Sequence, residues 1–149
     1  MAGRRPRSGK VALLGMAFLI LAGIWLLFRL AVRPNLGISG ASNAERVEYI
    51  ESFGWEAGKV PSEVREIRIP ARFDEAYEQY NAIQKEQGFD LRKYSACTAY
   101  KYTYRIKNYD GADPVVPINA NLIVVDGKIV GADISSAEAN GFVTVLAKK

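Results

Sequence analysis

The sequence predicts an α+β protein: one N-terminal transmembrane helix, followed by a small domain of two helices packed on one face of a mostly antiparallel sheet of four or five strands. Three observations lead to this fold class. An uncharged apolar run fills Val11–Phe28, two later segments repeat apolar residues with a helical period, and Asp126-Gly127 separates two β-branched runs. We expect four parts: a basic cytoplasmic tail (1–10), the transmembrane anchor (11–32), a linker (33–42) and an extracytoplasmic domain (43–149).

The run Val11–Phe28 is 18 residues long and contains no charge and no proline. A helix of that length spans about 27 Å, close to the ~30 Å hydrocarbon core of a bilayer. More cations precede the run than follow it, which favours a cytoplasmic N-terminus at the cell membrane. They are Arg4, Arg5, Arg7 and Lys10 before it, and Arg29 and Arg33 after it. A cleaved signal peptide is the alternative, although its apolar region usually has only about 7–15 residues.

Charge and residue types exclude several classes of function. Six of the 20 basic residues precede Pro34 and all 16 acidic residues follow it, so the domain carries 14 cations, 16 anions and a net charge of −2. This balance argues against a nucleic-acid partner, which needs a clustered basic surface. The chain has no histidine and one cysteine, which removes the commonest general base, the commonest metal ligands and an internal disulfide. We therefore expect no cofactor and no metal.

The segment after the anchor is predicted to lead directly into the first helix of the domain. Pro34–Ala41 (PNLGISGA) is typical of a flexible linker, with extended chain packed on the domain as the alternative. Ser42 and Glu45 have the spacing of a capping box, which predicts a helix over Asn43–Phe53 that ends at Gly54. The expected buried stripe and the aromatic residue that packs on the helix end are Val47, Ile50, Phe53 and Trp55.

A short edge strand and a second helix are expected next. Prolines bracket Glu63–Pro70, and apolar residues alternate with charged ones inside it, which predicts the edge strand. The second helix is predicted over Phe73–Gln87 and ends at Gly88. One face of this helix repeats apolar residues: Phe73, Ala76, Tyr77, Tyr80 and Ile83.

A long strand is predicted over Cys97–Tyr109, with tyrosines on one face and cations on the other. The strand tyrosines and two helix tyrosines define our candidate ligand site, a pocket between helix and sheet for a small ligand. Its residues are Tyr77, Tyr80, Tyr100, Tyr102 and Tyr104. In the simpler interpretation, these tyrosines pack in the core. The cationic face (Lys101, Arg105 and Lys107) is either solvated or a platform for an acidic polymer.

Asp126-Gly127 lies between Val115–Val125 and Lys128–Ser136, which predicts a hairpin with a type I′ turn. An unbroken register from this turn places Asp133 on the face of Leu122, as a lone carboxylate near the core and a possible site. Both faces of the hairpin are partly apolar near the turn. Either both faces are covered by the fold, or one of them is an interface.

The remaining segments give weaker signals. Asn140–Leu146 predicts a final short strand. Asp110 and Asp113 lie in a turn-rich loop, but they lack the spacing of a calcium-binding loop. We interpret Cys97 as a packed thiol, and a nucleophilic role would need a neighbouring lysine, arginine or helix N-terminus.

Several runs of the sequence resemble one protein family. They are NAERVEYIESFGW, VREIRIP, FDEAYEQYN, QGFDLRKY, YTYRIKNY and NANLIVVDGKIVGADI. Over about Asn43–Phe142 the chain resembles the domain of unknown function 4830 family of small, clostridial-type membrane-anchored proteins. The resemblance implies a Gram-positive surface protein, and it supplies no catalytic or binding residues.

From these observations we expect a membrane-anchored extracytoplasmic module that binds a protein or cell-wall component without catalysis. A small-ligand sensor or carrier that uses the tyrosine pocket is the alternative. An enzyme based on carboxylates, tyrosines or Cys97 is the third hypothesis, and the chain offers no paired acid and base to support it.

Overall fold

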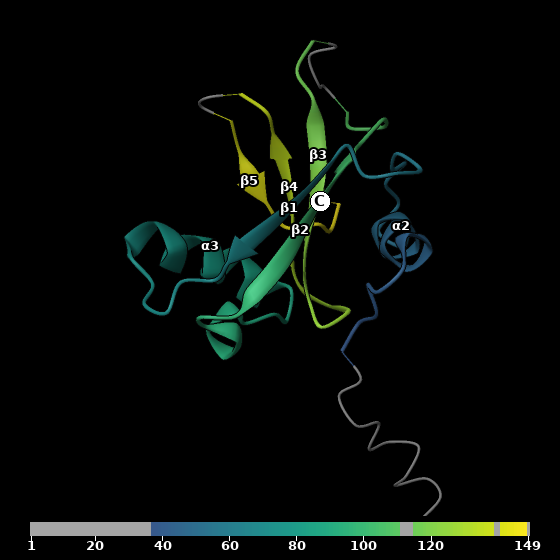
Figure 1. Cartoon of the computed structure of the whole chain (residues 1–149). Helices are drawn as coiled ribbons and strands as arrows, with labels where there is room; N and C mark the ends of the chain where they lie inside the picture. Colours follow the sequence, from purple (N-terminus) through teal and green to yellow (C-terminus); the bar gives the residue numbers. More distant parts are fainter. Residues whose placement is uncertain (1–36, 111–114, 139–140, 149) are drawn as a thin grey trace, which may run out of the picture. The chain divides into compact units, whose positions relative to one another are not determined.

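Five strands form one antiparallel sheet whose spatial order equals their order in the chain (Figure 1). The strands are β1 (Glu63–Arg68), β2 (Thr98–Arg105), β3 (Ile118–Val125), β4 (Lys128–Ser136) and β5 (Val143–Thr144). The helical elements are α2 (Asn43–Glu51), α3 (Glu75–Glu86) and the short 3-10 helix η1 (Leu91–Tyr94). The predicted α+β class, with two helices on an antiparallel sheet, is confirmed.

The computed structural model describes residues 37–110, 115–138 and 141–148. The predicted basic tail and the apolar run Val11–Phe28 lie outside these residues. Within the described ranges, no helix is both long and apolar enough to cross a membrane.

The two helices lie on opposite faces of the sheet, whereas we expected both on one face (Figure 1). One core cluster joins Ile50 of α2 to Leu122 of β3, and a separate cluster joins Leu91 of η1 to Ile123 of β3, with Tyr77 of α3 packed against it. Leu122 and Ile123 point to opposite faces, yet both are buried. A sheet that is apolar on both faces needs a cover on each, so both faces of the hairpin are covered by the fold.

The first helix begins as predicted. Glu45 and Ser42 form the capping box, in which the Ser42 N–H donates to Glu45 Oε2 (2.8 Å) and the Glu45 N–H donates to Ser42 Oγ (3.2 Å). The Ser39 hydroxyl also donates to Glu45, and this bond is the main cause that lowers the pKa of the Glu45 carboxyl. Gly54 has φ +82°, which confirms its predicted left-handed conformation, although the helix ends at Glu51 and not at Phe53 as predicted.

The segment before α2 packs on the domain as extended chain, so residues 37–41 are not a free linker. Ser39 bridges to Lys128 at the start of β4, and the Gly40 N–H donates to the Gly127 carbonyl (2.9 Å). Arg46 of α2 holds the same segment, because its Nη1 donates to the Gly40 carbonyl (2.6 Å). The chain therefore enters the domain beside the β3–β4 turn.

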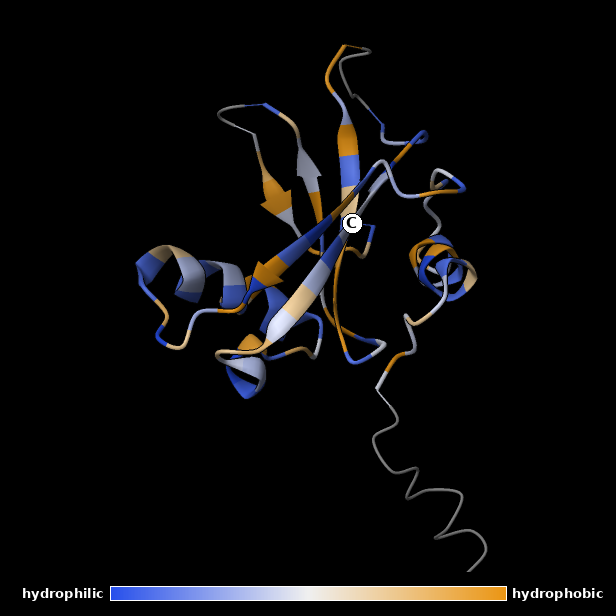
Figure 2. Ribbon diagram, in the orientation of Figure 1, coloured by the Kyte–Doolittle hydropathy of each residue, from blue (hydrophilic) through white to orange (hydrophobic). Residues whose placement is uncertain are grey.

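The core-facing side of α3 is only partly apolar: Phe73, Tyr77 and Tyr80 of the predicted face pack against the core, but buried polar residues accompany them. Asn81 and Gln84 are the buried residues of the helix, whereas Ala76 is exposed. Figure 2 shows α3 as mainly hydrophilic along its length. The helix ends as predicted at Gly88, whose φ is +82°. A helix over the margin of a sheet meets unpaired backbone groups, and amide side chains satisfy them.

Two glutamine side chains lie beside β4 where this strand has no neighbouring strand. One is Gln84 of α3, and the other is Gln87, which directly follows the helix. Gln84 Oε1 accepts from the Ala132 N–H (2.8 Å), and Gln87 Nε2 donates to the Ala132 carbonyl (2.8 Å). Gln87 Oε1 also accepts from the Leu146 N–H (2.8 Å), which ties the C-terminal segment to the helix. β5 pairs only with Ile134 and Ser135 of β4. At Ala132 the glutamine side chains therefore form the backbone hydrogen bonds that a neighbouring strand would otherwise form.

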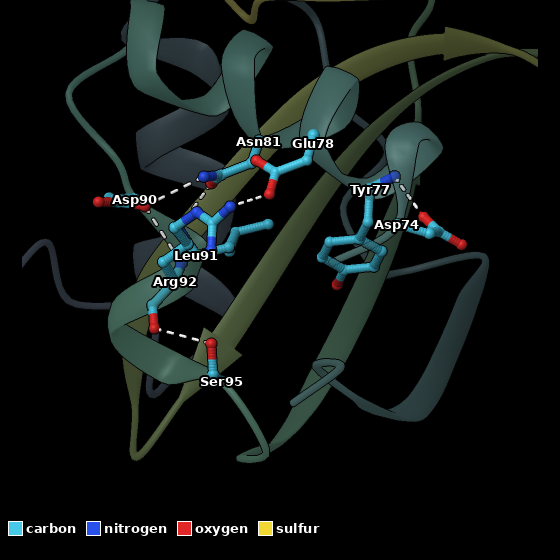
Figure 3. A network of polar contacts seen from close by, with 8 residues as sticks. All are labelled: Asp74, Tyr77, Glu78, Asn81, Asp90, Leu91, Arg92 and Ser95. Atoms are coloured by element: carbon cyan, nitrogen blue, oxygen red, sulfur yellow. Dashed lines mark hydrogen bonds and ion pairs between the residues drawn. The ribbon is translucent and has the colours of Figure 1, made fainter. Parts of the chain in front are cut away.

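A second polar network fastens α3 to η1 (Figure 3). Asn81 Oδ1 accepts from the Leu91 N–H (2.8 Å), and Asn81 Nδ2 donates to Asp90 Oδ1 (3.1 Å). This second bond is the main cause that lowers the pKa of the Asp90 carboxyl. Arg92 forms an ion pair with Glu78 across the same gap. Helix and 3-10 turn thus form one unit over the sheet.

The β3–β4 hairpin has the predicted turn but a shifted ladder. Asp126 and Gly127 have φ values of +48° and +73°, as a type I′ turn requires. Val124 pairs with Ile129, but Ile123 pairs with Gly131, so Val130 is an extra residue, a β-bulge. Because of the bulge, the side chain of every later β4 residue points to the opposite face of the sheet from the one that an unbroken register would give.

Candidate functional site

The structure does not bring the five candidate tyrosines together. Tyr77 and Tyr80 pack with the α3 face of the sheet, whereas Tyr102 and Tyr104 pack with the α2 face. Tyr100 shares the α2 face by alternation along β2, and it is 45% exposed with its hydroxyl on Glu66 (3.2 Å). The predicted tyrosine pocket depended on both helices covering one face. With one helix on each face, the sheet separates the two groups of rings.

A pocket of about 280 Å³ opens instead beside the C-terminal segment. We call it the aromatic pocket. Its lining residues come from three distant parts of the chain: Trp55, Tyr109, Asp110, Thr144, Val145, Ala147 and Lys148. Since these parts are far apart in sequence, the fold and not a local motif builds the pocket.

Three aromatic rings form a stack along the aromatic pocket. The Trp55 and Tyr109 rings lie 5.6 Å apart at an interplanar angle of 8°, and the Tyr109 and Phe142 rings lie 5.5 Å apart at 26°. Trp55 is buried, whereas Phe142 is 37% exposed, so the stack runs from the core to the surface. Stacked aromatic surface that reaches solvent is typical of recognition sites.

Hydrogen bonds fix the indole at the base of this stack. Trp55 Nε1 donates to the Leu146 carbonyl (2.6 Å), which joins the end of α2 to the C-terminal segment. Asn108 joins the third part, because its Oδ1 accepts from the Glu56 N–H (2.8 Å) and its Nδ2 donates to the Gly54 carbonyl (3.0 Å). Trp55 packs at the end of the first helix as predicted, and here it also forms a pocket wall.

Charged side chains complete the lining. Lys148 Nζ lies 4.6 Å from the centre of the Trp55 ring, and Asp110 contributes a carboxylate to the same pocket. The two ion pairs among the described residues, Arg65–Glu63 and Arg92–Glu78, involve neither of these side chains. The aromatic pocket thus offers a flat apolar wall, one anion and one cation.

The sequence does contain a signal for this pocket, in residues other than the five predicted tyrosines. Each stacked aromatic residue stands within two positions of a glycine in a turn-rich stretch, in the runs GW (54–55), YDG (109–111) and GF (141–142). Aromatic side chains presented by loops often serve recognition. Loop aromatics would therefore have been a better guide here than the tyrosines of regular elements.

A buried polar cluster lies under α3 on the other face of the sheet. Asp133, which is 2% exposed, accepts from the Tyr80 hydroxyl (2.7 Å) and from Asn121 Nδ2 (2.7 Å), and Asn121 Oδ1 accepts from the Thr103 hydroxyl (2.8 Å). We predicted Asp133 as a carboxylate near the core, but on the face of Leu122. The bulge moves it to the opposite face, where it pairs with Asn121.

Burial is the main cause that raises the pKa of the Asp133 carboxyl, while its hydrogen bonds and the charge of Lys101 oppose the rise. Burial and the nearby Asp133 charge also raise the pKa of the Tyr80 hydroxyl. Both carboxylate oxygens have partners within the fold, so the cluster fastens α3 to β3 and β4. We interpret it as a structural connection and the aromatic pocket as the site.

The remaining candidate residues have ordinary surroundings. Cys97 is half-buried against the α3-side core cluster, in line with the packed-thiol interpretation. Arg105 and Lys107 are exposed, and Lys101 is half-buried near Asp133. In the described part of the chain, no three His, Cys, Asp or Glu side chains gather as a metal ion would require.

Comparison with known proteins places the chain in a family. No curated protein and no solved structure matches it. Residues 49–134 match the family described as "Domain of unknown function (DUF4830)", and this range covers more than half of the 149 residues. It contains Trp55, Tyr109 and Asp110 of the aromatic pocket, whereas Phe142 and the C-terminal wall follow it. The chain therefore belongs to the DUF4830 family, as its sequence runs suggested.

Proposed function

We propose that this chain is a membrane-tethered, extracytoplasmic binding module without catalytic activity, and that the aromatic pocket is where it takes its ligand. One observation carries the proposal: two stacked rings and two opposite charges line a pocket in the half of the domain away from Gly37, and a third ring continues the stack to the surface. The partner we envisage is a surface protein or a cell-wall component of a Gram-positive cell.

The sequence supports the tether. Val11–Phe28 has the length and composition of a membrane-spanning helix, and the excess of cations before it favours a cytoplasmic N-terminus. The domain that follows would then face outward.

The position of the pocket fits such a tether. Residues 37–41 run beside the β3–β4 turn, at the Val125 end of β3. The walls of the pocket begin beyond the other end of β3, where Ile106 pairs with Ile118 and the Lys107 N–H donates to the Glu56 carbonyl. An eight-residue strand spans about 25 Å, so the aromatic pocket is presented away from the point where the chain enters.

The chemistry of the lining favours recognition over catalysis. The chain has no histidine, and the lining of the pocket contains one carboxylate and one ammonium group. Large aromatic surfaces flanked by a few polar groups are typical of sites that bind and orient a ligand. Such a site needs no activated nucleophile.

Site-specific photocrosslinking in intact cells tests this proposal. One full-length variant carries p-benzoylphenylalanine in place of Phe142, at the exposed end of the stack, and a control variant carries it in place of the exposed Glu48 of α2. We expect a discrete adduct from position 142 and none from position 48. Equal adducts from both positions, or no adduct from position 142, would overturn the proposal.

The tether needs its own measurement, by protease added to intact cells. We expect the domain to be digested without lysis, since it should lie outside the membrane. A domain that resists protease until the cells are lysed would contradict the predicted orientation.

A further inference from the structure

We infer that the aromatic pocket binds an organic cation, an ammonium or guanidinium group on a flexible chain, and that Lys148 occupies the place of this group until a ligand displaces it. The inference rests on the proposed function and names the chemical class of its ligand. Three features of the described residues carry it: the surroundings of Trp55, the position of Lys148 and the carboxylate of Asp110.

The indole of Trp55 already contacts one aromatic ring and one cation. Tyr109 stacks in parallel on the indole at 5.6 Å, and Lys148 Nζ lies 4.6 Å from its centre. A cation within about 6 Å of an aromatic centre is attracted by the ring quadrupole, and tryptophan gives the strongest attraction of the aromatic side chains. The fold therefore already contains the contact that an external ammonium group would make.

Lys148 is a contact that a ligand can replace. It is exposed, and it follows Leu146, the last buried residue of the described chain, by two positions. It belongs to neither ion pair among the described residues, so its contact with Trp55 is not reinforced by a carboxylate partner. A flexible lysine held by one cation–π contact at the surface is a weakly held group, which a ligand cation can displace.

An external cation would gain a second interaction. Asp110 lines the same pocket and takes part in no ion pair among the described residues. A ligand cation that lies over Trp55 can therefore meet the Asp110 carboxylate. Because the domain has a net charge of −2, the field around the pocket does not oppose a cation.

The size of the pocket limits the ligand. Its volume of about 280 Å³ is just below the ~300–1,000 Å³ of ordinary small-molecule sites. This space suits one side chain or head group, and the stack toward Phe142 would support the atoms beside it. A lysine or arginine side chain of a partner protein and a free small cation share this chemistry, and the test below separates them.

Trp55 can report binding directly. The chain has two tryptophans, Trp25 and Trp55, so Trp25→Phe in the full-length protein in detergent leaves one emitter at the pocket. The probes are N-acetyl-lysine methylamide, N-acetyl-arginine methylamide and tetramethylammonium, with N-acetyl-norleucine methylamide as the neutral analogue. We expect saturable changes in emission with the cationic probes and none with norleucine. A response to tetramethylammonium alone would assign a free cation, whereas tighter binding of the lysine or arginine probe would assign a protein side chain.

Variants of Lys148 test whether its ammonium group occupies the place of the ligand cation. Lys148→Ala should bind the cationic probe about two- to five-fold more tightly, because a competing contact is gone, whereas Lys148→Arg keeps a competing cation and should bind like the parent. Lys93→Ala removes a positive charge from an exposed site on η1 and controls for net charge. Asp110→Asn should weaken binding up to about five-fold at low salt, with a smaller effect at high salt.

Failure of this inference is distinguishable from failure of the proposed function. An equal response to the norleucine probe, or the same affinity in Lys148→Ala and Lys148→Arg, would overturn the cation site. If the photocrosslinker at position 142 still forms its discrete adduct in that case, the binding module stands with a ligand of another class. Absence of both signals would overturn both proposals.

Discussion

The guanidinium carbon of Arg46 lies 3.7 Å from the centre of the Tyr102 ring. The same side chain donates from Nε to the Tyr104 hydroxyl (2.9 Å) and from Nη1 to the Gly40 carbonyl (2.6 Å), and it is 6% exposed. It belongs to neither ion pair of the described residues, so carbonyl dipoles and a ring face stabilise its charge. One residue of α2 thus joins the incoming segment, the helix and β2.

Arg46→Lys should destabilise the domain by about 2 kcal/mol. The ammonium group of lysine cannot reproduce the several directed N–H donors of the planar guanidinium group, so buried acceptors lose their donor. Urea unfolding of the full-length protein in detergent, followed by Trp55 emission in the Trp25→Phe background, measures this loss. Arg92→Lys is the matched control, since its ion pair with Glu78 is half-exposed and should be worth about 0.5 kcal/mol. Equal losses in the two variants would contradict the buried role of Arg46.

Gly131→Ala should cost about 1–3 kcal/mol. A Cβ at this position would lie 3.1 Å from Gln84 Oε1 of α3 and 3.3 Å from Leu91 Cδ2 of η1, and both residues are buried. Gly37→Ala is the control, because its Cβ would meet the flexible Lys128 side chain and should cost little. If the contact with Gln84 causes the loss, Gly131→Ala should cost less in a Gln84→Ala background. Strict additivity in that double-mutant cycle would refute the explanation.

Asp133 should give the domain a pH dependence that Asp133→Asn lacks. Burial raises the folded-state pKa of Asp133 above its ordinary 3.8, so the folded state holds this proton more tightly than the unfolded state. The resulting stabilisation is full below 3.8 and is lost as pH rises through the raised pKa. The free energy of unfolding of the wild type, relative to Asp133→Asn, should therefore fall between these two values. Both proteins share Glu45 and Asp90, whose lowered pKa values act in the opposite direction, so the difference isolates Asp133. A flat difference across this range would contradict the prediction.

Gln87→Ala should loosen the C-terminal segment. The change removes the acceptor of the Leu146 N–H and the donor to the Ala132 carbonyl, and Leu146 in turn accepts from Trp55. We expect faster proteolytic removal of the C-terminal residues and a red shift of Trp55 emission, as the indole gains contact with water. Gln79→Ala, at an exposed position of the same helix, should change neither signal. A similar red shift in both variants would point to a general effect on α3.

Local signals in the sequence predicted the local structure well. The capping box of Ser42 and Glu45, the left-handed Gly54 and Gly88, and the Asp126-Gly127 turn all depend on a few neighbouring residues, and all are confirmed. The class of the fold followed from these signals and from the apolar periods. Each of these signals lies within one turn or one hairpin, so the types and spacing of a few residues determine the local structure.

Long-range features escaped prediction for a physical reason. One extra residue at Val130 moved Asp133 to the other face, because side chains alternate with every residue of a strand. The buried amides of Asn81 and Gln84 broke the apolar pattern, since their partners belong to η1 and β4. The aromatic pocket joins residues 55, 109 and 148, so no window of sequence contains it.

The glutamine side chains along β4 affect whether copies of this domain can join through their sheets. A neighbour's strand cannot add to β4 at Ala132, because Gln84 and Gln87 already saturate the backbone there. One edge of the sheet is β1, which pairs only with β2 among the described strands. Two copies joined through β1 across a two-fold axis with nearly full overlap would set Arg65 against Arg65 or Glu66 against Glu66. At Ala132 of β4 and along β1, the fold therefore opposes the addition of a strand from a neighbouring copy.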